Sequence, residues 1–225
     1  VCADRYDYGR TWPKRRPAFI AAAKVQQPAI ITLTECQHPA ADLIARQMGG
    51  SYLAESFQGS SIVFDTAQVH RSRRLAERRW LGGTQTHSLL GFEFEVVATG
   101  ELFNVLVSHL PPFTWRAKLR KAQQSQITAL TRPWNDPTIL ATDANWSKSF
   151  EAFNIHPHEI NRWTSARLSA THLRRANYRT SGGKFGVGNP VDYVMGRHGA
   201  GFASYDVLDG RKWSDHNALL VKVTL

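Results

Sequence analysis

Polar residues stand at the ends of several apolar, β-like runs, and this pattern constrains the fold more than any other feature. Strands that end at the same edge of a sheet bring the residues at their ends together. We therefore expect three polar stretches to form parts of one site. These stretches are Ser108-His109-Leu110 after the run 102–107, Thr142-Asp143-Ala144-Asn145 after the run 138–141, and Ser214-Asp215-His216 before the run 218–225.

Helical and strand-like segments alternate along the chain. Residues 14–26 predict a helix opened by Pro13, because proline suits a first helical turn. Residues 40–48 predict a second helix ended by Gly49-Gly50, and residues 115–130 a long third one. The segments 71–83 and 181–189 are expected to be loops near the site. Strands are predicted at residues 29–34, 51–55, 61–64, 89–98, 102–108, 138–142, 191–195, 203–208 and 218–224.

Length and composition favour one α/β domain over residues 1–225. The chain has 225 residues, 42% of them hydrophobic, and neither a repeat nor a linker divides it. No apolar stretch reaches the roughly 20 residues that cross a bilayer, and the N-terminus lacks a secretory pattern. The two cysteines are too few for a disulfide framework, and Cys36 is expected to be a buried thiol. We expect a cytoplasmic protein.

The net charge of +10 is concentrated in three basic clusters. Such clusters attract polyanions, and aromatic residues between them can stack on unpaired bases, which favours nucleic acid as a partner. A solvated surface that only improves solubility remains the alternative for each cluster taken singly. The clusters are Arg71, Arg73, Arg74, Arg78 and Arg79; Arg116, Lys118, Arg120 and Lys121; and Arg167, Arg174, Arg175 and Arg179. The aromatic residues are Trp80, Trp115, Trp163 and Tyr178.

The stretch after residues 138–141 offers an acid and an amide. The pleat of the strand would place Asp143 and Asn145 on one face. Asp143 could orient a water or bind a metal, and the Asn145 amide could donate to a phosphate oxygen. A turn stabilised by these side chains is the alternative.

Two histidines and further carboxylates are candidates for the same site as Asp143 and Asn145. His216 could stabilise negative charge on phosphorus, although Asp215-His216 could also be a surface pair. Asp192 lies inside a strand-like run, where a buried carboxylate needs a partner: a histidine ring or loop backbone. His109 and Glu35 each end a strand, and Mg²⁺ typically takes one or two protein carboxylates. An ordinary strand end is the alternative for both.

The order of these motifs resembles the endonuclease/exonuclease/phosphatase superfamily, which has the DNase I-like fold. The resemblance covers roughly residues 10–225 and includes Trp12 and Arg16 before the first helix. It implies a two-sheet β-sandwich flanked by helices, four layers in all. The matching stretches are residues 31–37 (Ile-Thr-Leu-Thr-Glu-Cys-Gln), 104–110 (Asn-Val-Leu-Val-Ser-His-Leu), 139–145 (Ile-Leu-Ala-Thr-Asp-Ala-Asn), 191–194 (Val-Asp-Tyr-Val) and 214–217 (Ser-Asp-His-Asn).

The resemblance also implies a role for each candidate residue. Glu35 would bind Mg²⁺ or Mn²⁺ with help from Asp215. Asp143 would orient or deprotonate the attacking water, and Asn145 would hold the scissile phosphate. The remaining roles are transition-state stabilisation by His109 and His216 and orientation of His216 by Asp192. Apart from the resemblance, Arg116 and Arg179 of the basic clusters are expected to bind substrate.

Two departures from the superfamily pattern stand out. The family's first strand ends in an asparagine ahead of the first helix, whereas this chain begins with Val1-Cys2-Ala3-Asp4. We expect native residues before Val1, because loss of a central strand would leave backbone unpaired on both neighbours. The second departure is Thr142, where the family usually has glycine; a local change of this kind should be tolerated.

Three functions remain open from the sequence. The first is a metal-dependent nuclease that acts on DNA or RNA, with DNA preferred. The second is a phosphatase or phosphodiesterase that acts on a lipid headgroup or a small phosphoester, which a basic surface would also suit. The third is a non-catalytic nucleic-acid-binding module that kept the fold.

Overall fold

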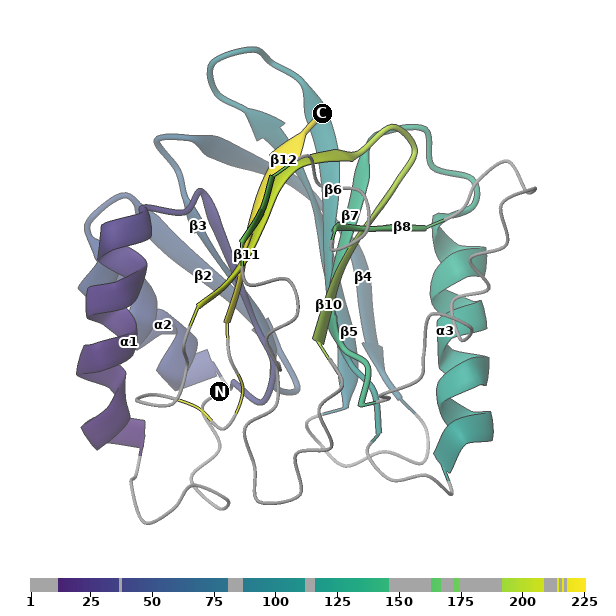
Figure 1. The fold of residues 1–225 in the computed structure, drawn as a ribbon, viewed down its shortest axis with the longest axis horizontal. Coiled ribbons are helices and arrows are strands. Elements are labelled where there is room, and N and C mark those ends of the chain that lie inside the picture. The colour runs from purple at the N-terminus through teal and green to yellow at the C-terminus, as the bar shows by residue number, and fades with distance from the viewer. Residues whose placement is uncertain are drawn as a thin grey trace.

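Two β-layers lie face to face between helices (Figure 1). Helices α1 (Trp12–Gln26) and α2 (His38–Met48) cover one outer side, and α3 (Ala117–Thr131) covers the other. The predicted α/β class, a β-sandwich with helices outside, is confirmed. The computed structural model describes residues 12–36, 38–80, 87–111, 116–145, 163–166, 172–174, 192–208, 214, 216 and 218–225.

One layer is a six-stranded sheet, and its register aligns the predicted site residues. Parallel strands β6 and β7 place His109 opposite Asp143, and β10 runs antiparallel to β7 with Asp192 opposite Asp143. Three predicted residues therefore lie side by side at the same end of these strands. The order is β4 (Val69–Arg79), β5 (Ser88–Val96), β6 (Leu102–His109), β7 (Thr138–Asp143), β10 (Asp192–Arg197) and β8 (Thr164–Ser165).

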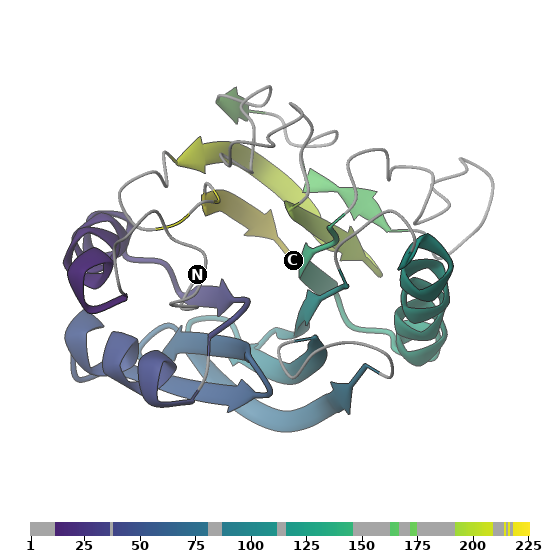
Figure 2. The same ribbon diagram turned by 90° about the horizontal axis from the view of Figure 1, so that it is seen from below.

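The other layer consists of two three-stranded sheets (Figure 2). Within the described residues, β1 pairs only with β3 and β12 only with β11, so each leaves one edge unpaired. Ile31 of β1 and Ala218 at the start of β12 nevertheless pack against the same apolar cluster. The sheets are β1 (Ile30–Leu33), β3 (Ser60–Asp65) and β2 (Tyr52–Phe57), and β12 (Ala218–Thr224), β11 (Gly201–Leu208) and β9 (His172–Arg174).

Strand β6 shows why the central strands are continuous apolar runs. Val105 and Val107 point into the space between the layers, whereas Leu106 packs in the cluster beneath α3. Both faces are therefore buried, which removes the polar alternation of a half-exposed strand. Phe64 of β3 meets Phe94 of β5 edge to face across the layers, with ring centroids 5.3 Å apart. This packing fixes the layers and the strand ends that carry the site.

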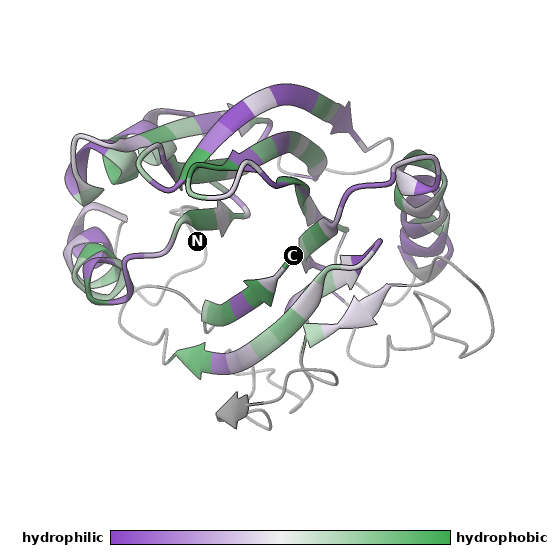
Figure 3. Ribbon diagram, turned by 90° about the horizontal axis from the view of Figure 1, so that it is seen from above, coloured by the Kyte–Doolittle hydropathy of each residue, from purple (hydrophilic) through white to green (hydrophobic). Residues whose placement is uncertain are grey.

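Strand β4 corrects the prediction of a loop at residues 71–83. Residues 69–79 pair with β5, with two irregularities in the register, and only residues 81–83 lie outside the described part. The loop prediction was wrong because β4 is an edge strand. Most of its side chains are exposed, only Val69 and Ala76 are buried, and Figure 3 shows a largely hydrophilic strand. Arginines on an edge also oppose pairing with other chains.

The other predicted helices and strands agree with the structure to within a few residues. The short strands β8 and β9 were not predicted. The expected loop at 181–189 lies outside the described residues. Cys36 is a buried free thiol, as expected. None of the described helices combines the length and the apolar character needed to cross a membrane.

Candidate active site

The site lies at the end of the sandwich where β6 and β7 finish. The end of β1 belongs there too, as a chain of hydrogen bonds shows. Ser61 donates through Oγ to the Cys36 carbonyl over 2.7 Å, and the neighbouring Ser60 is bonded to Ser88 of β5 over 2.8 Å. Leu89, next to Ser88, is paired with Ser108. Glu35 therefore leaves β1 at the same end as His109.

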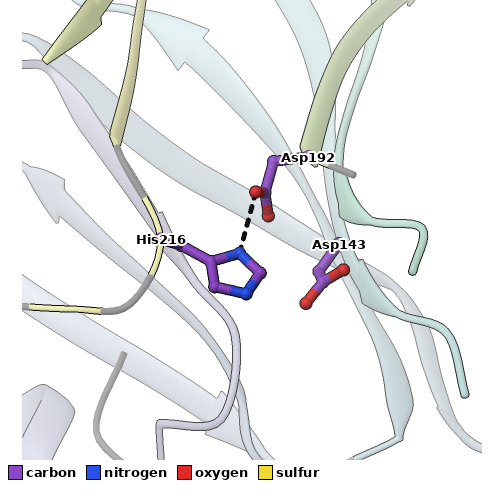
Figure 4. Close-up of side chains that lie close together, drawn as sticks. All are labelled: Asp143, Asp192 and His216. Carbon is purple, nitrogen blue, oxygen red and sulfur yellow. Dashed lines mark hydrogen bonds and ion pairs between the residues drawn. The ribbon is translucent and has the colours of Figure 1, made fainter. Parts of the chain in front are cut away.

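Three side chains converge at this end (Figure 4). Asp143 ends β7, Asp192 begins β10, and His216 precedes β12. One ligand atom from each lies within 4.8 Å of the others. His216 Nδ1 and Asp192 Oδ2 are 2.8 Å apart, and since a carboxylate accepts, Nδ1 carries the hydrogen.

Asp143 is buried beside two histidines and a second carboxylate. Its Oδ1 accepts the Asn145 backbone N–H over 2.9 Å, and its Oδ2 lies 3.6 Å from His109 Nε2. Burial first, and the charge of Asp192 second, raise the pKa of Asp143 to about 6 against the opposing effect of both histidines. A carboxyl group with this pKa can exchange a proton near neutral pH.

His109 is buried and packs edge to face against His87, with ring centroids 4.6 Å apart. His87 was missed in the sequence. Burial, followed by the charges of His109 and Arg116, lowers the pKa of His87 to about 3, so the ring is neutral at physiological pH. Thr86-His87-Ser88 directly precedes the apolar residues of β5. The pattern used in the sequence analysis, polar residues next to an apolar run, also marks His87.

Two predicted residues adopt left-handed backbone conformations, Glu35 with φ of 55° and Asn145 with φ of 49°. Such conformations cost roughly 1–3 kcal/mol and gather at functional sites. Asn145 also donates through Nδ2 to the Leu110 carbonyl over 2.8 Å, and within the described part of the chain the second hydrogen of this amide has no acceptor.

The remaining predicted residues lie outside this central group. Glu35 is half-buried and is not a member of the Asp143–Asp192–His216 group. Arg116 is half-buried immediately before α3. Asp215 and Arg179 fall outside the described residues.

The donor set of the central group fits a hard divalent cation. Two carboxylates and an imidazole within 4.8 Å of one another offer the oxygen and nitrogen ligands that Mg²⁺ and Mn²⁺ take. Two like charges in a buried place are also unfavourable without a cation or a proton. The arrangement can therefore bind a metal, hold an imidazole in one tautomer and move a proton at Asp143.

Comparisons with known proteins identify the fold. No protein-family profile and no curated protein sequence matches the chain. Solved structures do: the endonuclease/exonuclease/phosphatase from Bacteroides vulgatus superposes with a TM-score of 0.79 at 14% identity, over 96% of this chain and 92% of the other. The mannosyl-6-phosphatase Bt3783 of Bacteroides thetaiotaomicron gives 0.77 at 14% identity, over 96% and 92%.

A third structure is D. rerio TDP2 complexed with single-strand DNA product, with a TM-score of 0.76 at 14% identity over 97% of this chain and 94% of the other. The chain therefore has the fold of the endonuclease/exonuclease/phosphatase superfamily, and the resemblance drawn from its motifs is confirmed for the fold. At these identities the likeness concerns the fold and leaves the substrate open.

Proposed function

We propose that the protein is a metal-dependent phosphoesterase, and more specifically a nuclease that hydrolyses phosphodiester bonds. The observation that carries the proposal is the convergence of Asp143, Asp192 and His216 at the strand ends, with His109 beside Asp143. Phosphodiester cleavage needs an aligned water and donors around the phosphoryl oxygens. This set of side chains can supply both.

Each side chain has a role in this proposal. Asp143 accepts a proton from the attacking water, which its raised pKa of about 6 favours. Asp192 accepts a hydrogen bond from Nδ1 of the His216 ring, and in the protonated ring Nε2 donates to the phosphate. His109 stabilises charge from the other side of Asp143, and the free amide hydrogen of Asn145 contacts a phosphate oxygen.

Glu35 and Asp215 are the proposed ligands of Mg²⁺ or Mn²⁺, and the left-handed backbone of Glu35 supports a functional position. Bound there, the ion would act as a Lewis acid that offsets the negative charge of the phosphate. The donor set of the central group would suit a divalent ion equally.

Nucleic acid is the proposed substrate, with DNA ahead of RNA. The net charge of +10 supports a polyanion, and so does the solved complex of TDP2 with a DNA product. Among the described residues, no acidic side chain pairs with Arg78 or Arg79. Arg116 and Arg179 remain proposed substrate contacts.

A small phosphoester is the second candidate substrate. Three arginines of the first basic cluster are engaged by acids: Arg71 and Arg74 by Glu55, and Arg73 by Glu93. This lowers the charge that β4 offers to a polyanion. A mannosyl-6-phosphatase is also among the structural neighbours.

The test is hydrolysis of single-stranded DNA, plasmid, RNA and bis(p-nitrophenyl) phosphate with Mg²⁺, Mn²⁺ or EDTA. We expect metal-dependent cleavage of nucleic acid that Asp143→Asn abolishes. Asp42→Asn is the matched control, since it breaks an exposed acid–imidazole pair with His38 on α2. Cleavage of phosphomonoesters alone would favour the second candidate. Tight DNA binding without cleavage under any metal would favour the binding module.

A further inference from the structure

The backbone of His87 is fixed by a hydrogen bond to its own carbonyl and by the side chain of the next residue, Ser88. The Trp80 N–H donates to the His87 carbonyl over 3.1 Å, which closes the β4–β5 pairing at this end. Ser88 donates through Oγ to Ser60 over 2.8 Å and approaches the Phe57 carbonyl at 3.1 Å, so it ties β5 to the other layer. A ring attached to this point has little freedom to move.

The His87 ring meets the ring of His109 at a centroid distance of 4.6 Å and an interplanar angle of 61°. Both residues are buried, with 3% and 2% of their surface exposed. Edge-to-face contacts of this kind are attractive, and a neutral ring also attracts a cation over its face. Because His87 is neutral at physiological pH, it does not repel a protonated His109.

The contact with His87 restrains the orientation of the His109 ring. The Nε2 atom of His109 lies 3.6 Å from Asp143 Oδ2, a longer separation than a hydrogen bond. The second side-chain torsion of histidine is broad, so packing against a neighbouring ring contributes to its orientation. An imidazole that has to point at a phosphoryl oxygen loses effectiveness when it rotates away.

We propose that His87 is a positioning residue whose fixed ring holds the His109 imidazole toward Asp143. The proposal rests on the proposed phosphoesterase function, in which His109 stabilises the transition state. His87 acts through His109 and takes no part in the reaction itself. What matters is therefore the aromatic ring and its place, and a ring without nitrogen should serve as well.

Three variants test this: His87→Leu, His87→Phe and the control Leu90→Ala. Leucine fills the space without a ring, phenylalanine keeps the ring, and Leu90 is a fully buried residue farther along β5. With bis(p-nitrophenyl) phosphate and Mg²⁺, His87→Leu should lower kcat by about 10- to 100-fold with KM within about 2-fold. His87→Phe and Leu90→Ala should stay within about 3-fold of wild type. Thermal unfolding confirms that each variant is folded.

A spectroscopic readout needs neither substrate nor metal. Ring ¹⁵N chemical shifts of His109 in EDTA at pH 7 report which nitrogen carries the proton. They should change in His87→Leu and stay as in wild type in His87→Phe and Leu90→Ala. Unchanged His109 shifts in His87→Leu would overturn the proposal. Equal loss of kcat in His87→Phe and His87→Leu would also overturn it. An inactive wild type would refute the phosphoesterase function, and the shifts would still decide the positioning role.

Discussion

The edge strand β4 and the strand-end site both contain charged residues, but charges of opposite sign are paired at β4, whereas charges of the same sign lie together at the site. At the edge, Arg71 and Arg74 of β4 pair with Glu55 of β2 near solvent, and the exposed Arg73 lies 2.8 Å from the buried Glu93. At the site, the carboxylates of Asp143 and Asp192 lie within 4.8 Å of each other in a more buried place.

The difference separates charges that stabilise the fold from charges that work against it. Exposed pairs of opposite sign contribute about 0–1 kcal/mol each and keep the edge soluble. Two like charges in a buried site oppose folding, which agrees with the catalytic role that we propose for them. The net charge of the chain is therefore a poor indicator of where substrate binds. Charged groups that lack a neighbour of opposite charge are a better indicator.

Asp143→Asn should lower the activity more than any other proposed substitution. Loss of the proton acceptor is expected to lower kcat by about 10³- to 10⁴-fold, with KM nearly unchanged. Single-turnover hydrolysis of bis(p-nitrophenyl) phosphate measures it, with Asp42→Asn as the control. A variant that keeps a tenth of wild-type activity would remove Asp143 from the chemistry.

Asp192→Asn should have the second largest effect. An asparagine carries no negative charge to stabilise the protonated His216 ring, so the ring would no longer donate from both nitrogens. We expect kcat to fall by about 100-fold. Ring ¹⁵N shifts of His216 should show the changed protonation in the same variant. Wild-type shifts together with normal kcat would contradict the orienting role.

The free energy of unfolding should fall as the pH rises, because Asp143 loses its proton in a buried place. The pKa of Asp143 is raised to about 6, so the folded state binds its proton more tightly than the unfolded state. That contribution to stability is complete below pH 4 and is lost as the pH rises through 6. In EDTA at pH 8, the free energy of unfolding from urea denaturation should therefore be roughly 3 kcal/mol higher for Asp143→Asn than for wild type, and at pH 3.5 the two should be equal. Equal stability at both pH values would contradict the buried like-charge pair.

Glu55→Gln should have the smallest effect, because it removes exposed ion pairs from Arg71 and Arg74. We expect a loss below about 1 kcal/mol by urea unfolding. Arg71 then loses its acidic partner, whereas Arg74 keeps Glu77, so single-stranded DNA should bind more tightly, with a steeper salt dependence in fluorescence anisotropy. A loss of several kcal/mol would mean that the edge, and not the core, holds the layers together.

The residues at the strand ends were predictable because β6 and β7 are buried on both faces. Their apolar runs stop abruptly at His109 and Asp143, which the parallel register then places side by side. Strand β4 was not predictable by the same reasoning, since an exposed edge carries no apolar pattern. The contact of His87 with His109 is made through space and leaves no spacing in the sequence, so only the place of His87 just before the apolar residues of β5 could have indicated it.

The left-handed backbone at Glu35 and Asn145 has a practical consequence for mutagenesis. Alanine at either position would remove the functional group and keep the steric penalty of its Cβ, whereas glycine would remove the group and relax the chain by about 1 kcal/mol. An alanine scan would thus mix two effects at these places. Glycine and alanine variants compared side by side would separate the loss of a ligand from the release of conformational tension.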